Sequence, residues 1–256
     1  MSVIAVVNQK GGVGKTSVTL GLASAAWAAD RRTLVVDLDP QGAAGWVLGV
    51  EPDDAGLTTA DLLGPGRLVS ARRAVRPSGW GGSVDVIPSA RPLQDLEVGT
   101  DRDATRLARS LAQLSDDYDL VLIDCAPSLG NLTVNALTAA SHAVIVTEPS
   151  SLGLRGIAAV ADTIDSVWER SNPGLDLAGV IVNRVPAVSG EAERRSEELA
   201  RTVGKRAVWQ PVIPQRVIVS EALGERRPIH SYGSRAGDLI DVFDQLYARL
   251  RRTTRR

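Results

Sequence analysis

The chain has 256 residues, 44% of them apolar, which is enough for one sizeable core and close to the upper length of a single α/β domain. Its one cysteine, Cys125, excludes an internal disulfide and a cysteine-rich metal site, and no apolar run approaches the roughly 18 residues of a membrane span. The formal net charge of −1 excludes a chain that is strongly basic throughout, although residues 184–256 alone carry 15 basic and 9 acidic side chains.

Short apolar runs rich in β-branched residues alternate with longer segments of helical periodicity. This alternation predicts an α/β fold with a doubly wound, mainly parallel sheet and helices on both faces. We expect one domain over residues 1–250, a basic tail over 251–256, and surface connections at Val50–Gly82 and Val185–Gly190. The expected strands are Val3–Val7, Leu34–Asp37, Val84–Ile87, Leu120–Asp124, Ala143–Thr147 and Leu177–Val182.

A glycine-rich segment, Gly11–Ser17, follows the first strand and opens a helical segment. Strand, glycine-rich turn and helix in this order are the context of a phosphate-binding loop. The glycines let backbone N–H groups turn towards phosphate oxygens, and the positive end of the helix faces the same anion. We therefore expect bound ATP with Mg²⁺, with Lys15 neutralising the phosphates, Thr16 binding the metal ion and Ser17 reaching the α-phosphate.

The loop departs from the common pattern, because Gln9 stands where a glycine is usual and Lys10 precedes the glycines. In this form, KGGVGKT, it resembles the deviant Walker A motif of the ParA/MinD family of P-loop ATPases. The resemblance implies a P-loop NTPase fold, hydrolysis of ATP, and a catalytic Lys10 that reaches the neighbouring protomer's phosphates in an ATP-bound dimer, as an arginine finger does. The ATP contacts that it implies are Lys10, Gly11, Gly12, Val13, Gly14, Lys15, Thr16 and Ser17.

Acidic residues end two of the expected strands. Asp124 follows the apolar run Leu120–Ile123, so it should emerge beside the phosphate loop at the carboxyl edge of the sheet, the Walker B position. Asp37 and Asp39 end the second strand, point the same way by the two-residue period, and precede Pro40, which breaks the strand. A phosphoryl-transfer site needs a carboxylate near magnesium and a group that orients the attacking water.

The segment DLDPQG, which contains Asp37 and Asp39, resembles the second acidic motif of the same family. By that resemblance Asp39 is catalytic and positions the hydrolytic water, while Thr16, Asp37 and Asp124 lie near the metal ion. Cys125, beside Asp124, is expected to be a small buried apolar residue rather than a nucleophile.

The residues expected around the base lie late in the chain. Asn183 ends the strand Leu177–Val182, and a side-chain amide matches the adenine edge as both donor and acceptor. Its position resembles that of the family's adenine-reading asparagine. The segment Val212–Ala222 is similar to the family's base-covering segment, which implies that Pro214 and Arg216 line the nucleotide, although Arg216 replaces an asparagine.

The likeness is greatest to the short Soj/ParA branch, which acts in chromosome and plasmid partition. It implies an ATP-dependent homodimer that binds DNA without sequence preference, and a ParB-like or other cargo-adaptor protein that stimulates hydrolysis and release. The first apolar run is too short for a signal peptide, so we expect a cytoplasmic protein. The resemblance to the partition branch implies that it is associated with the nucleoid. Because clustered positive charge suffices for such binding, the candidate DNA contacts are Arg226, Arg227, Arg235, Arg249, Arg251 and Arg252. Ile218 stands where the family's base-covering segment has its second basic residue.

Three other functions are considered. A MinD-like membrane-cycling ATPase ends in a short amphipathic helix, and the apolar residues of Asp238–Arg252 do follow helical spacing, but we expect this helix to dock on the sheet and no membrane to bind. A small-molecule kinase or ligase would require a second substrate pocket. A reductase of the nitrogenase iron-protein type needs paired cluster-binding cysteines, which Cys125 alone excludes.

Overall fold

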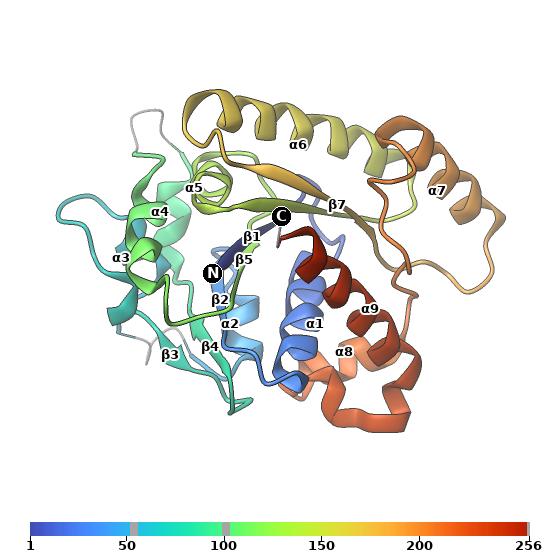
Figure 1. The fold of residues 1–256 in the computed structure, drawn as a ribbon, viewed down its shortest axis with the longest axis horizontal. Coiled ribbons are helices and arrows are strands. Elements are labelled where there is room, and N and C mark those ends of the chain that lie inside the picture. Colours follow the sequence, from blue (N-terminus) through green and yellow to red (C-terminus); the bar gives the residue numbers. More distant parts are fainter. Residues whose placement is uncertain (52–55, 99–102, 255–256) are drawn as a thin grey trace.

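The computed structural model describes residues 1–51, 56–98 and 103–254, which form a sheet flanked by helices (Figure 1). The strand order is β3-β4-β2-β5-β1-β6-β7, and every neighbouring pair is parallel except β3 with β4. The strands are β1 Ser2–Val7, β2 Thr33–Leu38, β3 Arg76–Pro77, β4 Val84–Ile87, β5 Leu120–Cys125, β6 His142–Thr147 and β7 Asp176–Val182. All six predicted strands are confirmed, whereas β3 lies in a stretch that was expected to be a surface connection.

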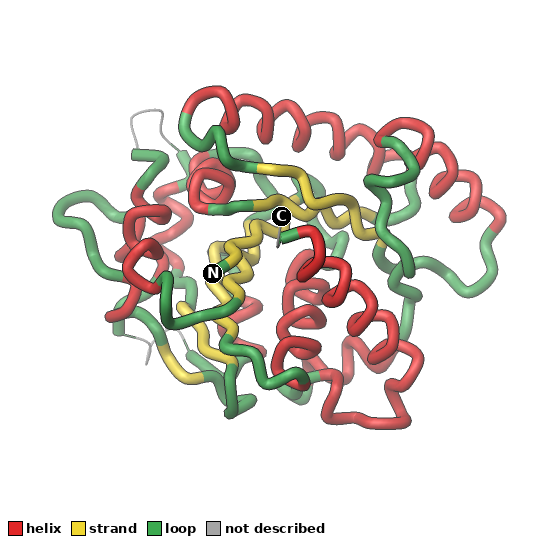
Figure 2. The backbone as a smooth tube through the Cα atoms, in the orientation of Figure 1, coloured by secondary structure: helices red, strands yellow, loops and turns green. Residues whose placement is uncertain are grey.

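Helices cover both faces of the sheet (Figure 2), which confirms the doubly wound prediction. The α-helices are α1 Lys15–Ala28, α2 Ala43–Val47, α3 Thr59–Leu63, α4 Arg106–Leu111, α5 Asn131–Ala139, α6 Ser151–Arg170, α7 Gly190–Val203, α8 Val217–Gly224 and α9 Gly237–Thr253. Short 3₁₀ segments are η2 Ala71–Arg73, η3 Arg91–Leu96, η4 Ala112–Leu114 and η5 Ile229–Ala236. None of the described helices is long and apolar enough to cross a membrane.

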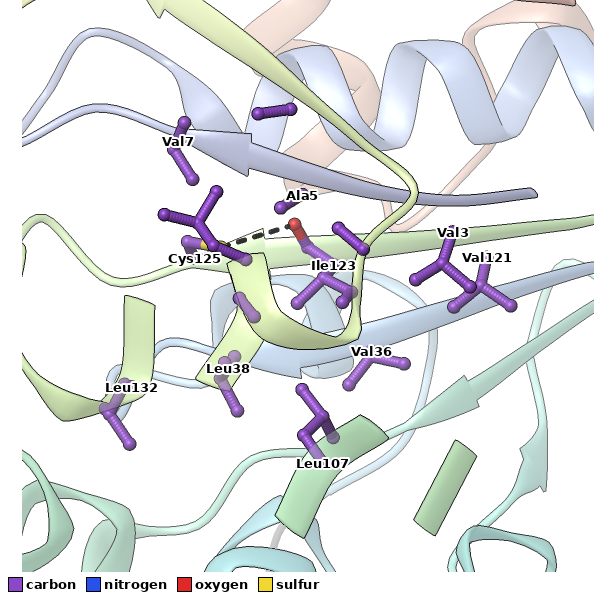
Figure 3. Packing of buried hydrophobic residues seen from close by; sticks show 14 of the residues in the cluster. Val3, Ala5, Val7, Val36, Leu38, Leu107, Val121, Ile123, Cys125 and Leu132 are labelled. Carbon is purple, nitrogen blue, oxygen red and sulfur yellow. Dashed lines mark hydrogen bonds between the residues drawn. The ribbon is translucent and has the colours of Figure 1, made fainter. Parts of the chain in front are cut away.

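Two apolar cores form because successive residues of a strand point to opposite faces. Val3, Ala5 and Val7 of β1 pack into a core shared with α3 to α6, part of which Figure 3 shows. Ile4 and Val6 pack into the other core, with α1, α2 and α9. Each core contains residues of β1, β2, β4, β5, β6 and β7. The strand ends that carry the polar residues are therefore anchored by buried residues on both faces of the sheet.

The final helix is docked, as predicted. Leu239, Phe243, Leu246 and Leu250 of α9 are at most 1% exposed. A Cβ atom added to Gly21 of α1 would lie 2.1 Å from the Phe243 ring, so the two helices meet as closely as a glycine permits. The helix expected over Asp238–Arg252 is α9, which runs through Thr253 and so continues past residue 250, the expected end of the domain. Residues 255–256 of the expected tail lie outside the described residues.

Candidate nucleotide site

The phosphate loop connects β1, which lies between β5 and β6, to α1. Gly12 and Gly14 adopt φ angles of 80° and 86°, which favour glycine, and Val13 between them is buried. Helix α1 starts at Lys15 with Gly14 as its N-cap, so the unpaired N–H groups of its first turn open on the loop. The predicted strand, loop and helix are therefore in the order that an anion site requires.

Lys15 is buried, at 7% exposure, and its Nζ donates a hydrogen bond of 3.5 Å to the carbonyl oxygen of Lys10. Burial lowers the pKa of Lys15, while the charges of Asp124, Cys125 and Asp39 oppose that shift. A buried ammonium is stabilised by a further negative charge, so an anion entering the loop would bind at this point.

Asp124 ends β5, and both of its carboxylate oxygens accept hydrogen bonds from α1. Thr16 Oγ1 donates to Oδ2 at 2.7 Å and Thr19 Oγ1 donates to Oδ1 at 3.2 Å. Burial raises the pKa of Asp124 to about 6, and the hydrogen bond from Thr16 is the largest opposing effect. A cation beside this carboxylate would replace the missing solvation.

The oxygen donors of Thr16 and Asp124 suit magnesium, which prefers hard oxygen ligands. Among the described residues there is no group of three or more His, Cys, Asp or Glu side chains that could hold a metal ion by itself. Magnesium usually takes one or two protein ligands together with substrate phosphates and water, so this donor set fits an ion that arrives with a nucleotide.

Asp37 has a structural role that the sequence did not indicate. It is fully buried, and its carboxylate accepts backbone N–H groups of Gly45 at 2.7 Å and of Asp39 at 3.2 Å. It pairs with Asp124 in the register of β2 and β5. Burial raises the pKa of Asp37 well above its usual range, and the charge of Asp124 raises it further. Asp37 thus joins β2 to α2, and its place near a metal ion stays a prediction.

Asp39 lies at the carboxyl end of β2, less buried than Asp37. Its Oδ1 accepts the backbone N–H of Gln41 at 2.9 Å. Its charge acts on both Lys15 and Asp124, so the structure brings it to the phosphate loop. Its other carboxylate oxygen has no hydrogen-bond partner among the residues that the structure describes, so it is available to the site.

The predicted base-binding residues are also brought together. Asn183 Nδ2 donates to the carbonyl oxygen of Val13 at 2.8 Å, and the side chain is buried against the loop. A cavity of about 280 Å³ lies beside it, and its walls include Ser17, Pro214 and Arg216. Pro214 is held in place by a β-bridge with Val185. Arg216 is exposed, 3.9 Å from Asp238.

This chain is similar to known proteins over most of its length. The family described as AAA domain matches residues 1–177. The chromosome partitioning protein ParA of Myxococcus xanthus is 35% identical over 233 residues, which are 90% of this chain and 81% of that protein. The chain belongs to the ParA/MinD family of P-loop ATPases.

Two solved structures are similar to this chain. A cobyrinic acid a,c-diamide synthase from Mycobacterium smegmatis, with bound ADP and magnesium, is 32% identical with a TM-score of 0.74, over 88% of this chain and 91% of that one. The cell division ATPase MinD of Pyrococcus furiosus is 25% identical with a TM-score of 0.77, over 98% and 99%.

Beyond the residues expected from the ParA/MinD motifs, the structure adds Glu148 and Arg184. Arg184 adopts a φ angle of 55° and its guanidinium donates to the carbonyl oxygen of Gly12. Arg184 Nη1 lies 3.2 Å from Glu148 Oε1, and Lys10 Nζ lies 3.5 Å from Glu148 Oε2. One signal for them was available, since Glu148 directly follows β6 as Asp39 follows β2.

The six candidate DNA contacts fall into two groups of three. Arg226, Arg227 and Arg235 lie around η5 and each pairs with an acid, respectively Glu51, Glu225 and Glu221. Arg226 also packs over Trp46, 4.6 Å from the ring centroid. These three side chains are therefore largely engaged within the protein.

The second group, Arg249, Arg251 and Arg252, lies near the end of α9. Arg249 donates to the Arg206 carbonyl oxygen at 2.8 Å, and Arg251 lines a cavity with Ser2 and Leu120, at the amino edge of the sheet. Arg227, by contrast, lines a small cavity with Ser17 at the phosphate-loop end of α1. The two groups thus lie at opposite ends of α9, because the first precedes its start at Gly237 and the second lies in its last turns.

Proposed function

We propose that this protein is an ATP-dependent partition or positioning ATPase. ATP binding produces a homodimer, the dimer binds DNA without sequence preference, and an adaptor protein of the ParB kind stimulates hydrolysis and release. The observation that carries this proposal is the pair of lysines on one loop. Lys15 is buried beside Asp124, whereas Lys10 lies at the rim of the site with 32% of its side chain exposed.

The nucleotide binds with its phosphates against the backbone N–H groups of the loop and the ammonium of Lys15. Thr16 and Asp124 hold Mg²⁺, which supplies charge neutralisation at the phosphates. The base occupies the cavity beside Asn183, which also fixes the loop through Val13. The support for this arrangement is that Ser17, Asn183, Pro214 and Arg216 line one cavity beside the phosphate loop.

Hydrolysis requires a water molecule and extra positive charge at the phosphates. Asp39 orients the water, since one of its oxygens remains free of the backbone turn. The charge comes from Lys10 of the second protomer, because an exposed lysine at the rim can reach a neighbouring site. A monomer therefore holds ATP but turns it over slowly.

The DNA surface is assigned to the group at the end of α9. Arg249, Arg251 and Arg252 form no ion pair within the described residues, whereas the three arginines around η5 each face an acid. Three adjacent cations on the last turns of one helix suit phosphate contacts without sequence preference. A cytoplasmic protein on the nucleoid follows from this surface.

A second candidate is a small-molecule ligase, because one similar solved structure is a cobyrinic acid a,c-diamide synthase with bound ADP and magnesium. A polar cavity of about 370 Å³, lined by Glu148, Arg184 and Gln215, lies next to the rim and has room for a second substrate. MinD-like membrane binding finds less support, since the apolar face of α9 is buried against α1.

The deciding experiment compares binding to random-sequence duplex DNA and to anionic liposomes, with ADP and with a slowly hydrolysed ATP analogue. We expect retention on DNA with the analogue only, weakening as salt increases. Retention on liposomes would overturn the DNA assignment in favour of membrane cycling. Binding to neither surface would favour the ligase.

A further inference from the structure

Lys10, the lysine at the rim of the site, forms an ion pair with Glu148 of its own subunit. We propose that Glu148 is a positioning residue that holds Lys10 inside its own protomer and thereby opposes dimer formation until ATP is bound. This inference rests on the proposed role of Lys10 between protomers. It adds a resting position for that lysine and a residue that controls its release.

Two contacts fix where Lys10 rests. Asn8, which is 1% exposed, accepts the backbone N–H of Lys10 at 2.9 Å and donates to the carbonyl oxygen of Val146 at 2.6 Å. The start of the phosphate loop is thereby tied to the end of β6, where Glu148 follows. Lys10 Nζ lies 3.5 Å from both Glu148 Oε2 and Ser150 Oγ.

Glu148 is shared between two cations, one on each oxygen. Oε2 faces Lys10 and Oε1 faces Arg184, at 3.5 and 3.2 Å. Arg184 also donates to Gly12 and lines the cavity expected to take the base. Arg184, on the side of the base cavity, thus orients the Glu148 carboxylate, while the other oxygen of that carboxylate holds Lys10. Nucleotide entering that cavity meets Arg184 directly, so occupation of the site is communicated to the Lys10 pair.

The Lys10–Glu148 ion pair is strong enough to shift the dimer equilibrium and weak enough for Lys10 to be released from it. The Lys10 and Glu148 side chains are 32% and 23% exposed, so solvent screens the interaction in part. Breaking a pair of this kind changes an equilibrium by about two- to fivefold. A monomer must break it before Lys10 can reach a neighbour. The γ-phosphate of ATP carries more charge than one carboxylate and can therefore displace it.

The test measures the dimer dissociation constant by sedimentation, with the ATP analogue, for wild type, Glu148→Gln and Glu191→Gln. Glu191 lines the same 370 Å³ cavity but faces Arg195, so it controls for the loss of one negative charge. We expect dimers about two- to fivefold tighter for Glu148→Gln and unchanged for Glu191→Gln. Equal or weaker dimers for Glu148→Gln would overturn the proposal.

Each substitution is repeated with Lys10→Ala, and monomer affinity for a fluorescent ATP analogue is measured as a folding control. If Glu148 acts through Lys10, its substitution has no effect on dimerisation once Lys10 is absent. A gain that persists without Lys10 would also contradict the proposal. If Lys10→Ala alone dimerises as wild type does, the proposed function fails rather than the positioning role of Glu148.

Discussion

Asn183 lies so close to Gly14 that residue 14 has room for the hydrogen atom of a glycine but not for a side chain. A Cβ atom on Gly14 would lie 2.2 Å from Asn183 Nδ2, which itself donates to Val13. The phosphate loop and the base side of the site are therefore one rigid unit. A change in either residue should affect the binding of phosphates and of the base together.

Gly14→Ala should lower ATP affinity at least about tenfold, because the added methyl displaces Asn183 and an alanine is strained at a φ of 86°. The free energy of unfolding should fall by about 1–3 kcal/mol. Calorimetric titration and urea unfolding measure the two effects. Gly190→Ala is the matched control, because nothing lies within 4 Å of its Cβ position. Equal effects of the two variants would contradict the close contact.

Asp124 makes the stability of the protein depend on pH. Its pKa is raised from an ordinary 3.8 to about 6, so between these values the folded state binds more protons than the unfolded state. The contribution of Asp124 to the free energy of unfolding should therefore be fully present below pH 4 and be lost as the pH rises through 6, a change of up to about 3 kcal/mol. The buried Asp37 adds a change of the same sign.

Asp124→Asn should remove the share of this pH dependence that Asp124 carries and leave the nucleotide-free protein more stable than wild type at pH 7. Urea unfolding at pH 4.5 and 7.5 measures the difference between the two proteins. Magnesium-dependent ATP affinity of the wild type should weaken below pH 6, because the metal needs the ionised carboxylate. An identical pH dependence in the variant would show that other groups are responsible.

The two groups of arginines should separate DNA binding from stability. Replacing the three at the end of α9 by glutamine should lower affinity for random duplex DNA at least about tenfold and reduce the salt dependence. Any fall in Tm should come from Arg249, which donates to Arg206 and packs over Trp209. Replacing the three around η5 should mainly lower Tm, because Arg226 joins Trp46 and Glu51. The reverse pattern would move the DNA surface to η5. The sets are Arg249, Arg251 and Arg252, and Arg226, Arg227 and Arg235.

Asp39→Ala should lower the rate of hydrolysis at least about a hundredfold and accumulate the ATP-bound dimer, since the water loses its orienting carboxylate. Asp39→Asn keeps an acceptor for the N–H of Gln41 and separates the turn from the chemistry. Phosphate release and sedimentation follow the two effects. Normal turnover in both variants would place the water-orienting group elsewhere.

Much of the fold could be predicted because a parallel sheet buried on both faces leaves continuous apolar runs. Strand β3 escaped detection, since Arg76–Pro77 is two residues long and contains a proline, and only its pairing with β4 makes it a strand. The helical spacing of Asp238–Arg252 predicts α9 to within one residue at each end, and Arg251 and Arg252, which were assigned to the basic tail, lie in its last turn.

The residues of the site can likewise be predicted from the sequence only where they belong to a local motif. Lys15, Thr16 and Asp124 belong to local motifs, so the sequence predicts them and the structure brings them together. The contacts of Glu148 join residues 138 and 36 positions apart, which no local pattern encodes. The six candidate DNA contacts come from one basic segment of the sequence, and only the structure shows that they lie at two ends of α9.

The central claim is that the functional state is a dimer joined through Lys10. Sedimentation with a slowly hydrolysed ATP analogue tests it on wild type, Lys10→Ala and Lys205→Ala, the last a control at the exposed lysine outside the loop. We predict dimers for wild type and Lys205→Ala, and for Lys10→Ala a monomer that still binds the nucleotide. A Lys10→Ala dimer as stable as that of wild type would contradict the account.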